Sequence, residues 1–299
     1  MTDKYRQMED RIRGALFGVA CGDALGGPLE FMTPSEISRR HGGEVRHMVG
    51  GGWLNLRPGE TTDDTAMTLA VAEGIAENPA EPIPGIGRRF IEWYNSKPKD
   101  VGITCARVIT LADANCVETE AGWYEYSQMV DRAMDGRTGG NGALMRTVYV
   151  GLYYADDETR EDLADRIASM THWSDEAGED CRTYTMLVNE ALTDPEKVLS
   201  TIKELWADEH AEPTGYTRDS MTCALNAIAT TDNLEDAIVK AVNLGGDADT
   251  IGAITGGLAG AIYGYEQIPA MWKMFLSITD RNKLNDLADK ALKARTKGE

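Results

Sequence analysis

Two segments rich in glycine and other small residues constrain the fold of this chain most strongly. Residues 14–22 read GALFGVACG and residues 252–261 read GAITGGLAGA, both at spacings typical of helices. A glycine inside a helix costs roughly 1 kcal/mol relative to alanine, and close approach of two helix backbones would compensate for that cost. We therefore expect two central, buried helices that carry their adjoining polar loops into a shared cleft.

The rest of the sequence also favours helices. Apolar residues recur at helical spacing, strand-like alternation is nearly absent, and glycine or proline breakers separate the periodic segments. No low-complexity linker and no short repeat divides the chain. We predict an all-α fold of about a dozen helices. It would form a single compact, orthogonal multi-helix domain over residues 1–299, with a core at about 12–264 and C-terminal helices at 269–296.

Composition excludes several classes of function. The 49 acidic and 30 basic residues give a formal charge of −19, which disfavours binding to nucleic acid or to anionic membranes. The charged N-terminal segment and the shortness of the apolar runs predict neither an export signal nor a membrane span. Five scattered cysteines without a C-x-x-C pair favour a reducing, cytoplasmic location. A core of this size is sufficient for a monomer.

Two acidic clusters, residues 61–65 (TTDDT) and 245–250 (GGDADT), each precede a helix of small and apolar residues. One interpretation is helix capping, because a Thr or Asp side chain satisfies free amides at a helix N-terminus. Capping needs only one oxygen per helix, however, and both clusters carry several. If the clusters meet, their carboxylates repel one another unless cations neutralise them. With no histidine or cysteine nearby, one or two Mg²⁺ or Mn²⁺ ions are the leading alternative.

Other candidate residues have ordinary alternatives. The segment 139–146 (GGNGALMR) resembles a backbone-donating loop that opens a helix and could bind a phosphate or a sugar hydroxyl, or be only a turn. Glu30 could simply face solvent, and Asp100 could be a helix N-cap for Val101 onward. His172 could be a core imidazole, and Tyr216 a loop aromatic.

Taken together and in order, seven segments resemble the ADP-ribosylglycohydrolase family, most closely its dinitrogenase reductase-activating glycohydrolase branch. The resemblance covers about residues 12–264, and the two acidic motifs together with the GDALG and GNGALMR segments are specific as a set. The seven segments are GVACGDALGGPLEFM, GGWLNLRPGETTDDTAM, SKPKDVGITC, GGNGALMRT, THWSDEA, PTGY and GGDADTIGAITGGLAGAIYG.

The resemblance implies a central cleft with two Mn²⁺ or Mg²⁺ ions and assigns roles to individual residues. Its metal ligands would be Thr62, Asp63, Asp64, Asp247, Asp249 and Thr250. Its ADP-ribose would be bound by Gly140, Asn141 and Gly142, with His172 and Tyr216 beside it. Its catalytic acids would be Asp100, ranked first, then Glu30, with Asp63 as a further candidate.

The implied reaction is metal-dependent hydrolysis of the bond between ADP-ribose and a protein side chain, with arginine as the expected acceptor. The partner would be an ADP-ribosylated protein, and the product ADP-ribose. Two alternatives stay open. The same site could act on another linkage, such as serine-linked ADP-ribose, poly-ADP-ribose or O-acetyl-ADP-ribose, or the chain could be a non-catalytic ADP-ribose binder.

Overall fold

A computed structural model describes residues 3–296 of the chain, and this part is helical, with two isolated β-bridges and no β-strand. The all-α prediction is confirmed. The fifteen α-helices are α1 (Asp3–Gly26), α2 (Pro34–His41), α3 (Asp63–Glu77), α4 (Ile83–Asn95), α5 (Ile103–Ala114), α6 (Glu120–Ala133), α7 (Val148–Tyr153), α8 (Asp157–Ser169), α9 (Asp175–Ala191), α10 (Pro195–Trp206), α11 (Thr217–Ala229), α12 (Leu234–Val242), α13 (Ala248–Tyr263), α14 (Ala270–Phe275) and α15 (Ile278–Thr296). Three 3₁₀ helices, η1 (Gly27–Leu29), η2 (Leu144–Arg146) and η3 (Tyr265–Gln267), complete the fold.

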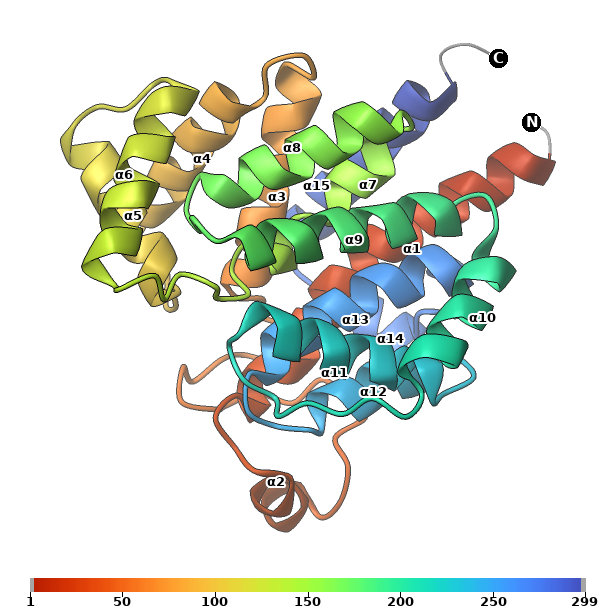
Figure 1. Ribbon diagram of the computed structural model, residues 1–299. Helices are drawn as coiled ribbons and strands as arrows, with labels where there is room; N and C mark the ends of the chain where they lie inside the picture. Colours follow the sequence, from red (N-terminus) through yellow and green to blue (C-terminus); the bar gives the residue numbers. More distant parts are fainter. Residues whose placement is uncertain (1–2, 297–299) are drawn as a thin grey trace.

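The two small-residue segments form the central pair of helices, α1 and α13, which lie side by side in Figure 1. Glycines spaced by four residues face each other in antiparallel register, Gly14 opposite Gly260 and Gly18 opposite Gly256. A Cβ atom added at Gly18 would lie 2.0 Å from the carbonyl oxygen of Gly256, and one at Gly256 would lie 2.0 Å from that of Gly18. The predicted close approach is therefore confirmed, and any side chain at this contact would force the backbones apart.

The antiparallel register places the C-terminal end of α1 beside the N-terminal end of α13. Gly22 faces Gly252, and Gly26 faces Ala248 at the start of α13. As a result, the chain that leaves α1 toward Glu30 runs past the second acidic cluster. Helix α3, which begins at the first cluster, contacts both α1 and α13. The glycine contacts thus bring three chain segments to one place.

Several other helices are stabilised by the side chain of their own N-cap residue. The side chains of Thr33, Asp156, Ser174 and Asn233 each accept a hydrogen bond from a backbone N–H in the first turn of the helix that follows. This is the usual way in which the free amides of a helix N-terminus are satisfied. The N-cap residues of α3 and α13 accept no such bond.

The remaining helices surround the central pair. Helices α4, α5 and α6 form one group beyond α3, and α9 to α12 cover the other side of α13 (Figure 1). The C-terminal helices expected at 269–296 are α14 and α15, and α15 contacts α1, α3 and α7. Among residues 3–296, no helix combines the length and apolarity that crossing a membrane requires.

Candidate active site

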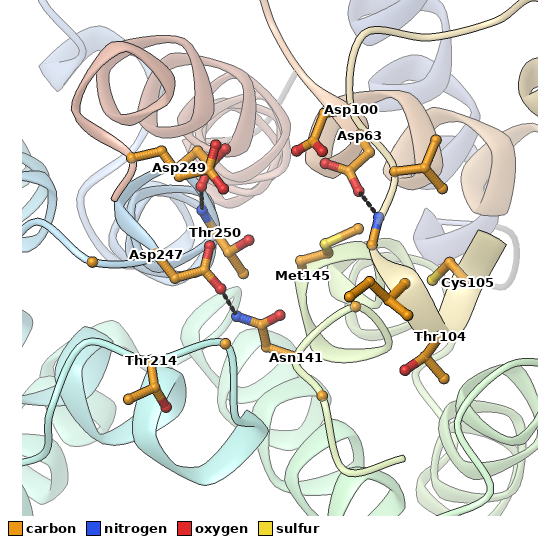
Figure 2. A pocket seen from close by; sticks show the side chains of 18 of the residues that line it. Asp63, Asp100, Thr104, Cys105, Asn141, Met145, Thr214, Asp247, Asp249 and Thr250 are labelled. Atoms are coloured by element: carbon orange, nitrogen blue, oxygen red, sulfur yellow. Dashed lines mark hydrogen bonds between the residues drawn. The ribbon is translucent and has the colours of Figure 1, made fainter. Parts of the chain in front are cut away.

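A cavity of about 590 Å³ lies where the N-termini of α3, α5 and α13 meet the segment that follows α1 (Figure 2). Its lining includes five carboxylates from four chain segments and, within the described chain, no lysine or arginine. The carboxylates are those of Glu30, Asp63, Asp100, Asp247 and Asp249. The structure therefore brings together the two acidic clusters, which are almost two hundred positions apart in the sequence.

The first cluster does not cap its own helix. Thr62 is the N-cap residue of α3, yet no side chain of the cluster accepts a bond from the first turn. Asp23 of α1 takes that role instead, because its carboxylate accepts hydrogen bonds from the N–H groups of Thr62 at 3.0 Å and Thr65 at 3.1 Å. The hydroxyls of both threonines also donate to Asp23. The capping interpretation is wrong for α3, and Asp63 and Asp64 are left available for another function.

In the second cluster, Asp249 accepts one bond from the first turn of α13, since its Oδ1 atom accepts from the Thr250 N–H at 2.9 Å. Asp247 occupies the N-cap position of α13 without a side-chain capping bond, and one of its oxygens accepts a hydrogen bond from the Asn141 side chain at 2.6 Å. The preceding turn needs glycine, since Gly246 has φ +60° and a Cβ there would lie 1.9 Å from the Pro213 carbonyl oxygen. This tight turn aims Asp247 at the cavity (Figure 2).

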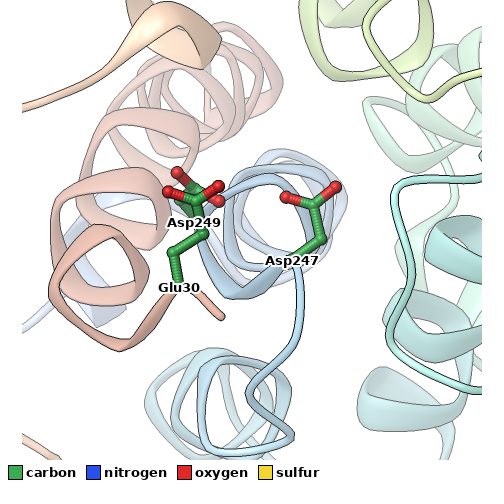
Figure 3. A group of neighbouring side chains, drawn as sticks. All are labelled: Glu30, Asp247 and Asp249. Carbon is green, nitrogen blue, oxygen red and sulfur yellow. The ribbon is translucent and has the colours of Figure 1, made fainter. Parts of the chain in front are cut away.

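Glu30 is far from the second acidic cluster in the sequence, but the fold places its carboxylate next to that cluster. One carboxylate oxygen from each of Glu30, Asp247 and Asp249 lies within 4.8 Å of the others (Figure 3). The expected role of Glu30 was that of a catalytic acid, whereas this geometry is that of a candidate cation ligand. The indole N–H of Trp53 donates to its carboxylate at 2.6 Å and fixes its orientation.

Burial and mutual repulsion make these carboxylates difficult to ionise. Loss of solvent, together with the charges of neighbouring acids, raises the pKa of Asp63 to about 7 and that of Glu30 to about 8. The same two causes raise the pKa of Asp64 and of Asp249 well above the usual range. Burial also raises the pKa of Asp23 to about 6, although its bonds to Thr62 and Thr65 oppose the shift.

This donor set fits hard divalent cations. Carboxylate and hydroxyl oxygens are the ligands that Mg²⁺ and Mn²⁺ prefer. Asp64 is completely buried, and its Oδ1 atom has no hydrogen-bond partner in the described chain, which is costly for a carboxylate oxygen unless a cation is bound there. Thr62 and Thr250 are also buried and add hydroxyl oxygens next to the two clusters.

Asp100 faces the cavity and is not a helix cap. Helix α5 begins at Ile103 with Gly102 as its N-cap residue, so the expectation of a helix from Val101 is wrong. The N–H of Gly102 donates to Asp63 at 3.2 Å, which ties the Asp100 loop to the first cluster. Burial is the main cause of the raised pKa of Asp100, and the charge of Asp247 adds to it.

The glycine-rich loop forms the opposite wall of the cavity. Gly140, Asn141 and Gly142 line it, and the Asn141 side chain also donates to Ser220 at 2.8 Å. The loop opens a helix as expected, and this helix is the 3₁₀ helix η2. Because the side-chain N–H groups of Asn141 donate to Asp247 and Ser220, this residue could offer a polar ligand only its side-chain oxygen.

His172 and Tyr216 are both next to this loop, but only His172 lines the cavity. His172 is buried, with its Nδ1 2.8 Å from the Thr171 hydroxyl, and burial together with the Arg146 charge lowers its pKa to about 3. It is therefore a neutral imidazole at physiological pH. Tyr216 pairs with Gly140 through backbone, remains partly exposed and donates its hydroxyl hydrogen bond to Glu176.

Two residues important to this arrangement were not predicted from the sequence. Asp23 lies within the GDALG segment, and an aspartate inside a helix of small residues is a signal of a buried polar contact that could have identified it. Trp53 follows three glycines, and nothing in its local pattern indicates that its indole reaches Glu30.

The raised pKa values predict how stability depends on pH. In the unfolded chain these acids lose their protons near pH 4, whereas in the metal-free folded protein Asp23, Asp63 and Glu30 keep them to about pH 6, 7 and 8. The folded state then binds more protons, so these groups lower the free energy of unfolding as pH rises from about 4 to about 8.

A bound cation removes this loss of stability, so the increase in Tm caused by Mg²⁺ should be larger at pH 8 than at pH 5. Thermal unfolding with Mg²⁺ and with EDTA measures it; an equal increase at both pH values would contradict the prediction.

Comparison with known proteins supports the sequence resemblance. The model of the family described as ADP-ribosylglycohydrolase matches residues 3–299. An ADP-ribosyl-[dinitrogen reductase] glycohydrolase of Rhodospirillum rubrum is 33% identical, with 95% of this chain and 96% of the relative covered. An ADP-ribosylarginine hydrolase Tri1 of Serratia proteamaculans is 30% identical, with 94% and 78% covered. A solved structure titled ADP-ribosylglycohydrolase-related protein complex superposes with a TM-score of 0.80 at 31% identity, covering 97% of this chain and 99% of that one.

Proposed function

The chain belongs to the ADP-ribosylglycohydrolase family, and from this premise we propose that it is a metal-dependent hydrolase that releases ADP-ribose from modified arginine side chains of proteins. The observation that carries the proposal is that carboxylates of both acidic clusters line one cavity, while Asp23 and not the first cluster accepts the bonds from the start of α3. A purely structural descendant of the family would have no use for so many unneutralised carboxylates.

The proposed ligand set comes from the two acidic clusters and from Glu30. Thr62, Asp63 and Asp64 on α3, and Asp247, Asp249 and Thr250 at the start of α13, would hold two Mn²⁺ or Mg²⁺ ions, and Glu30 would add an oxygen from the segment after α1. When bound, such ions polarise substrate oxygens and lower the pKa of a bound water. Asn141 holds Asp247 in place, as Trp53 holds Glu30.

The remaining cavity residues would bind and orient the substrate. Backbone amides of Gly140 and Gly142 would donate to the phosphate or ribose oxygens of ADP-ribose. His172, which is neutral, forms a wall behind this loop and cannot serve as a cation there. Tyr216 would contact ADP-ribose from the rim of the cavity.

Hydrolysis requires one proton to move between the reactants. Water forms a bond to the anomeric carbon, the bond from that carbon to the guanidine nitrogen breaks, and one proton of the water passes to the departing guanidine. We assign this transfer to the Asp100 carboxylate, which lines the cavity and forms no ion pair with a basic side chain of residues 3–296. Glu30 ranks below it, since its carboxylate lies within the candidate cation site.

Arginine is favoured as the acceptor for two reasons. Two of the similar proteins carry names that specify arginine, the Tri1 hydrolases of Serratia proteamaculans and Pseudomonas putida. In addition, the carboxylates of Glu30 and Asp100 lie at the same end of the cavity, where a cationic leaving group gains more than a neutral serine.

Matched peptides that carry ADP-ribose on arginine or on serine test this function. With purified protein and Mn²⁺, we expect ADP-ribose release from the arginine peptide, measured by mass spectrometry. If ADP-ribose were released only from the serine peptide, the substrate linkage would be serine and not arginine. Binding of ADP-ribose without release from either peptide would favour the non-catalytic alternative.

Asp100→Asn separates proton transfer from metal binding. The variant keeps the shape of the side chain but cannot accept a proton, so kcat should fall by roughly 10²–10⁴-fold. The affinity for Mn²⁺, measured by calorimetry, should stay within a few fold of the unmodified protein. Loss of metal binding in this variant would show that Asp100 is a ligand instead.

A further inference from the structure

Two large aromatic side chains are exposed together at the mouth of the cavity. Phe31 is 69% exposed and Trp53 is 54% exposed, and their ring centroids are 5.5 Å apart with a 40° angle between the planes. Both line the cavity next to Glu30. Single exposed apolar residues are common on proteins, but a contacting pair at the entrance of a candidate active site indicates a binding surface.

The position of this pair is fixed by the cation site itself. Phe31 has φ +62°, an unfavourable conformation for a bulky residue, and its N–H donates to the Gly246 carbonyl oxygen at 2.7 Å. Trp53 is held by its bond to Glu30. One ring is thus anchored beside Asp247 and the other on Glu30. The fold maintains a strained backbone that holds an apolar ring in solvent, which folding stability alone does not favour.

The electrostatic surroundings of the pair select for a cation. Glu30 and Asp100 lie at this end of the cavity, and no lysine or arginine of the described residues lines it. Aromatic faces attract cations, and a guanidinium group is planar, can stack on a ring and can donate to carboxylates in its own plane. A serine hydroxyl has neither the charge nor the planar face needed for stacking, and it has only one donor for the carboxylates.

We propose that Phe31 and Trp53 form the acceptor-binding wall of the site, which stacks on the guanidinium of the modified arginine while Glu30 and Asp100 accept its hydrogen bonds. This inference rests on the proposed function and deepens it by naming residues that determine the preference for arginine. ADP-ribose alone carries no guanidinium to stack on this wall, and the glycine-rich loop that would bind it comes from a different part of the chain.

Leucine variants of the two aromatic residues test the wall. The double variant Phe31→Leu/Trp53→Leu should raise KM for an ADP-ribosyl-arginine peptide by about tenfold or more, and should weaken competitive inhibition by agmatine, a free guanidinium compound, by a similar factor. The Kd of ADP-ribose should stay within about twofold, since that product carries no acceptor. Trp53→Phe keeps a ring but loses the donor to Glu30, so it should retain most of the agmatine affinity. Ile278→Ala, which removes an equally exposed apolar side chain outside the cavity, is the matched control and should change neither value.

These experiments can show separately whether the aromatic wall or the proposed hydrolase function is wrong. An active parent protein whose KM and agmatine inhibition are unchanged by the double variant would overturn the wall and leave the proposed function intact. A parent protein without activity on any arginine conjugate would overturn both. A parallel loss of ADP-ribose affinity in the double variant would also overturn the wall, because it would place the rings against ADP-ribose and not against the acceptor.

Discussion

Asp63→Asn and Asp249→Asn proteins are expected to lose at least about a thousandfold in kcat, equivalent to roughly 4 kcal/mol of transition-state stabilisation. Each substitution keeps the shape of the side chain and removes one charged ligand from the proposed cation site. Asp63 belongs to α3 and Asp249 to α13, so the effect should be similar from either side of the cavity. Release of ADP-ribose from an arginine-linked peptide in saturating Mn²⁺ measures it, with Glu118→Gln, an exposed acid outside the cavity, as the control.

The same variants should have the opposite effect on the stability of the metal-free protein. The pKa of Asp249 is raised by burial and by the charge of Asp64, so a neutral amide at this position relieves repulsion in the folded state. In EDTA at pH 8, Asp249→Asn should therefore raise Tm by roughly 2 °C, whereas in Mn²⁺ it should lower Tm relative to the unmodified protein. Unchanged turnover, or a Tm that moves in the same direction with and without metal, would contradict the ligand assignment.

Gly18→Ala and Gly256→Ala are expected to lower the free energy of unfolding by about 3 kcal/mol each. In both cases the new Cβ atom would lie 2.0 Å from a backbone oxygen of the facing helix, and backbone atoms at this contact cannot rotate away as a side chain can. The alternative is separation of α1 and α13, which would lose packing along both helices. Denaturant unfolding monitored by circular dichroism gives the value.

A buried glycine outside this contact provides the control. Gly85 lies in α4, and a Cβ there would meet its nearest neighbour at 3.5 Å, which is ordinary contact. Gly85→Ala should therefore be neutral or stabilise the protein by up to about 1 kcal/mol, as the helix propensities of the two residues predict. If Gly18→Ala behaved like Gly85→Ala, the two central helices could not be as close as described.

Much of the fold could be predicted because helical spacing and small residues act locally or through simple geometry. Glycines at Gly14, Gly18 and Gly22 recur every four residues on one face, and this spacing by itself indicates a close helix contact. Short helices were harder. Helices α7 and α14 have only six residues each, too few for periodicity to be recognised, and the observed number of helices exceeds the predicted dozen.

The residues of the site could be predicted from the sequence, but the hydrogen bonds that join them across distant segments could not. The sequence shows that both acidic clusters have more oxygen ligands than a helix N-terminus needs. The choice between capping and cation binding, however, depends on Asp23, which is some forty residues away from Thr62 and contacts it only in the folded chain. The orientation of Glu30 toward Asp249 and the exposure of Phe31 likewise depend on backbone bonds between distant segments, such as that from Phe31 to Gly246. The contacts of Glu30 and Phe31 leave no local sequence pattern, whereas Asp23 is at least marked by its position inside a helix of small residues.

An anomalous difference map from a crystal of the unmodified protein soaked in millimolar Mn²⁺ would show directly whether the two acidic clusters bind cations. We predict two peaks, about 3.5–4 Å apart, between Asp63 and Asp64 on one side and Asp247 and Asp249 on the other. A map with no peak between the N-termini of α3 and α13 would contradict the account.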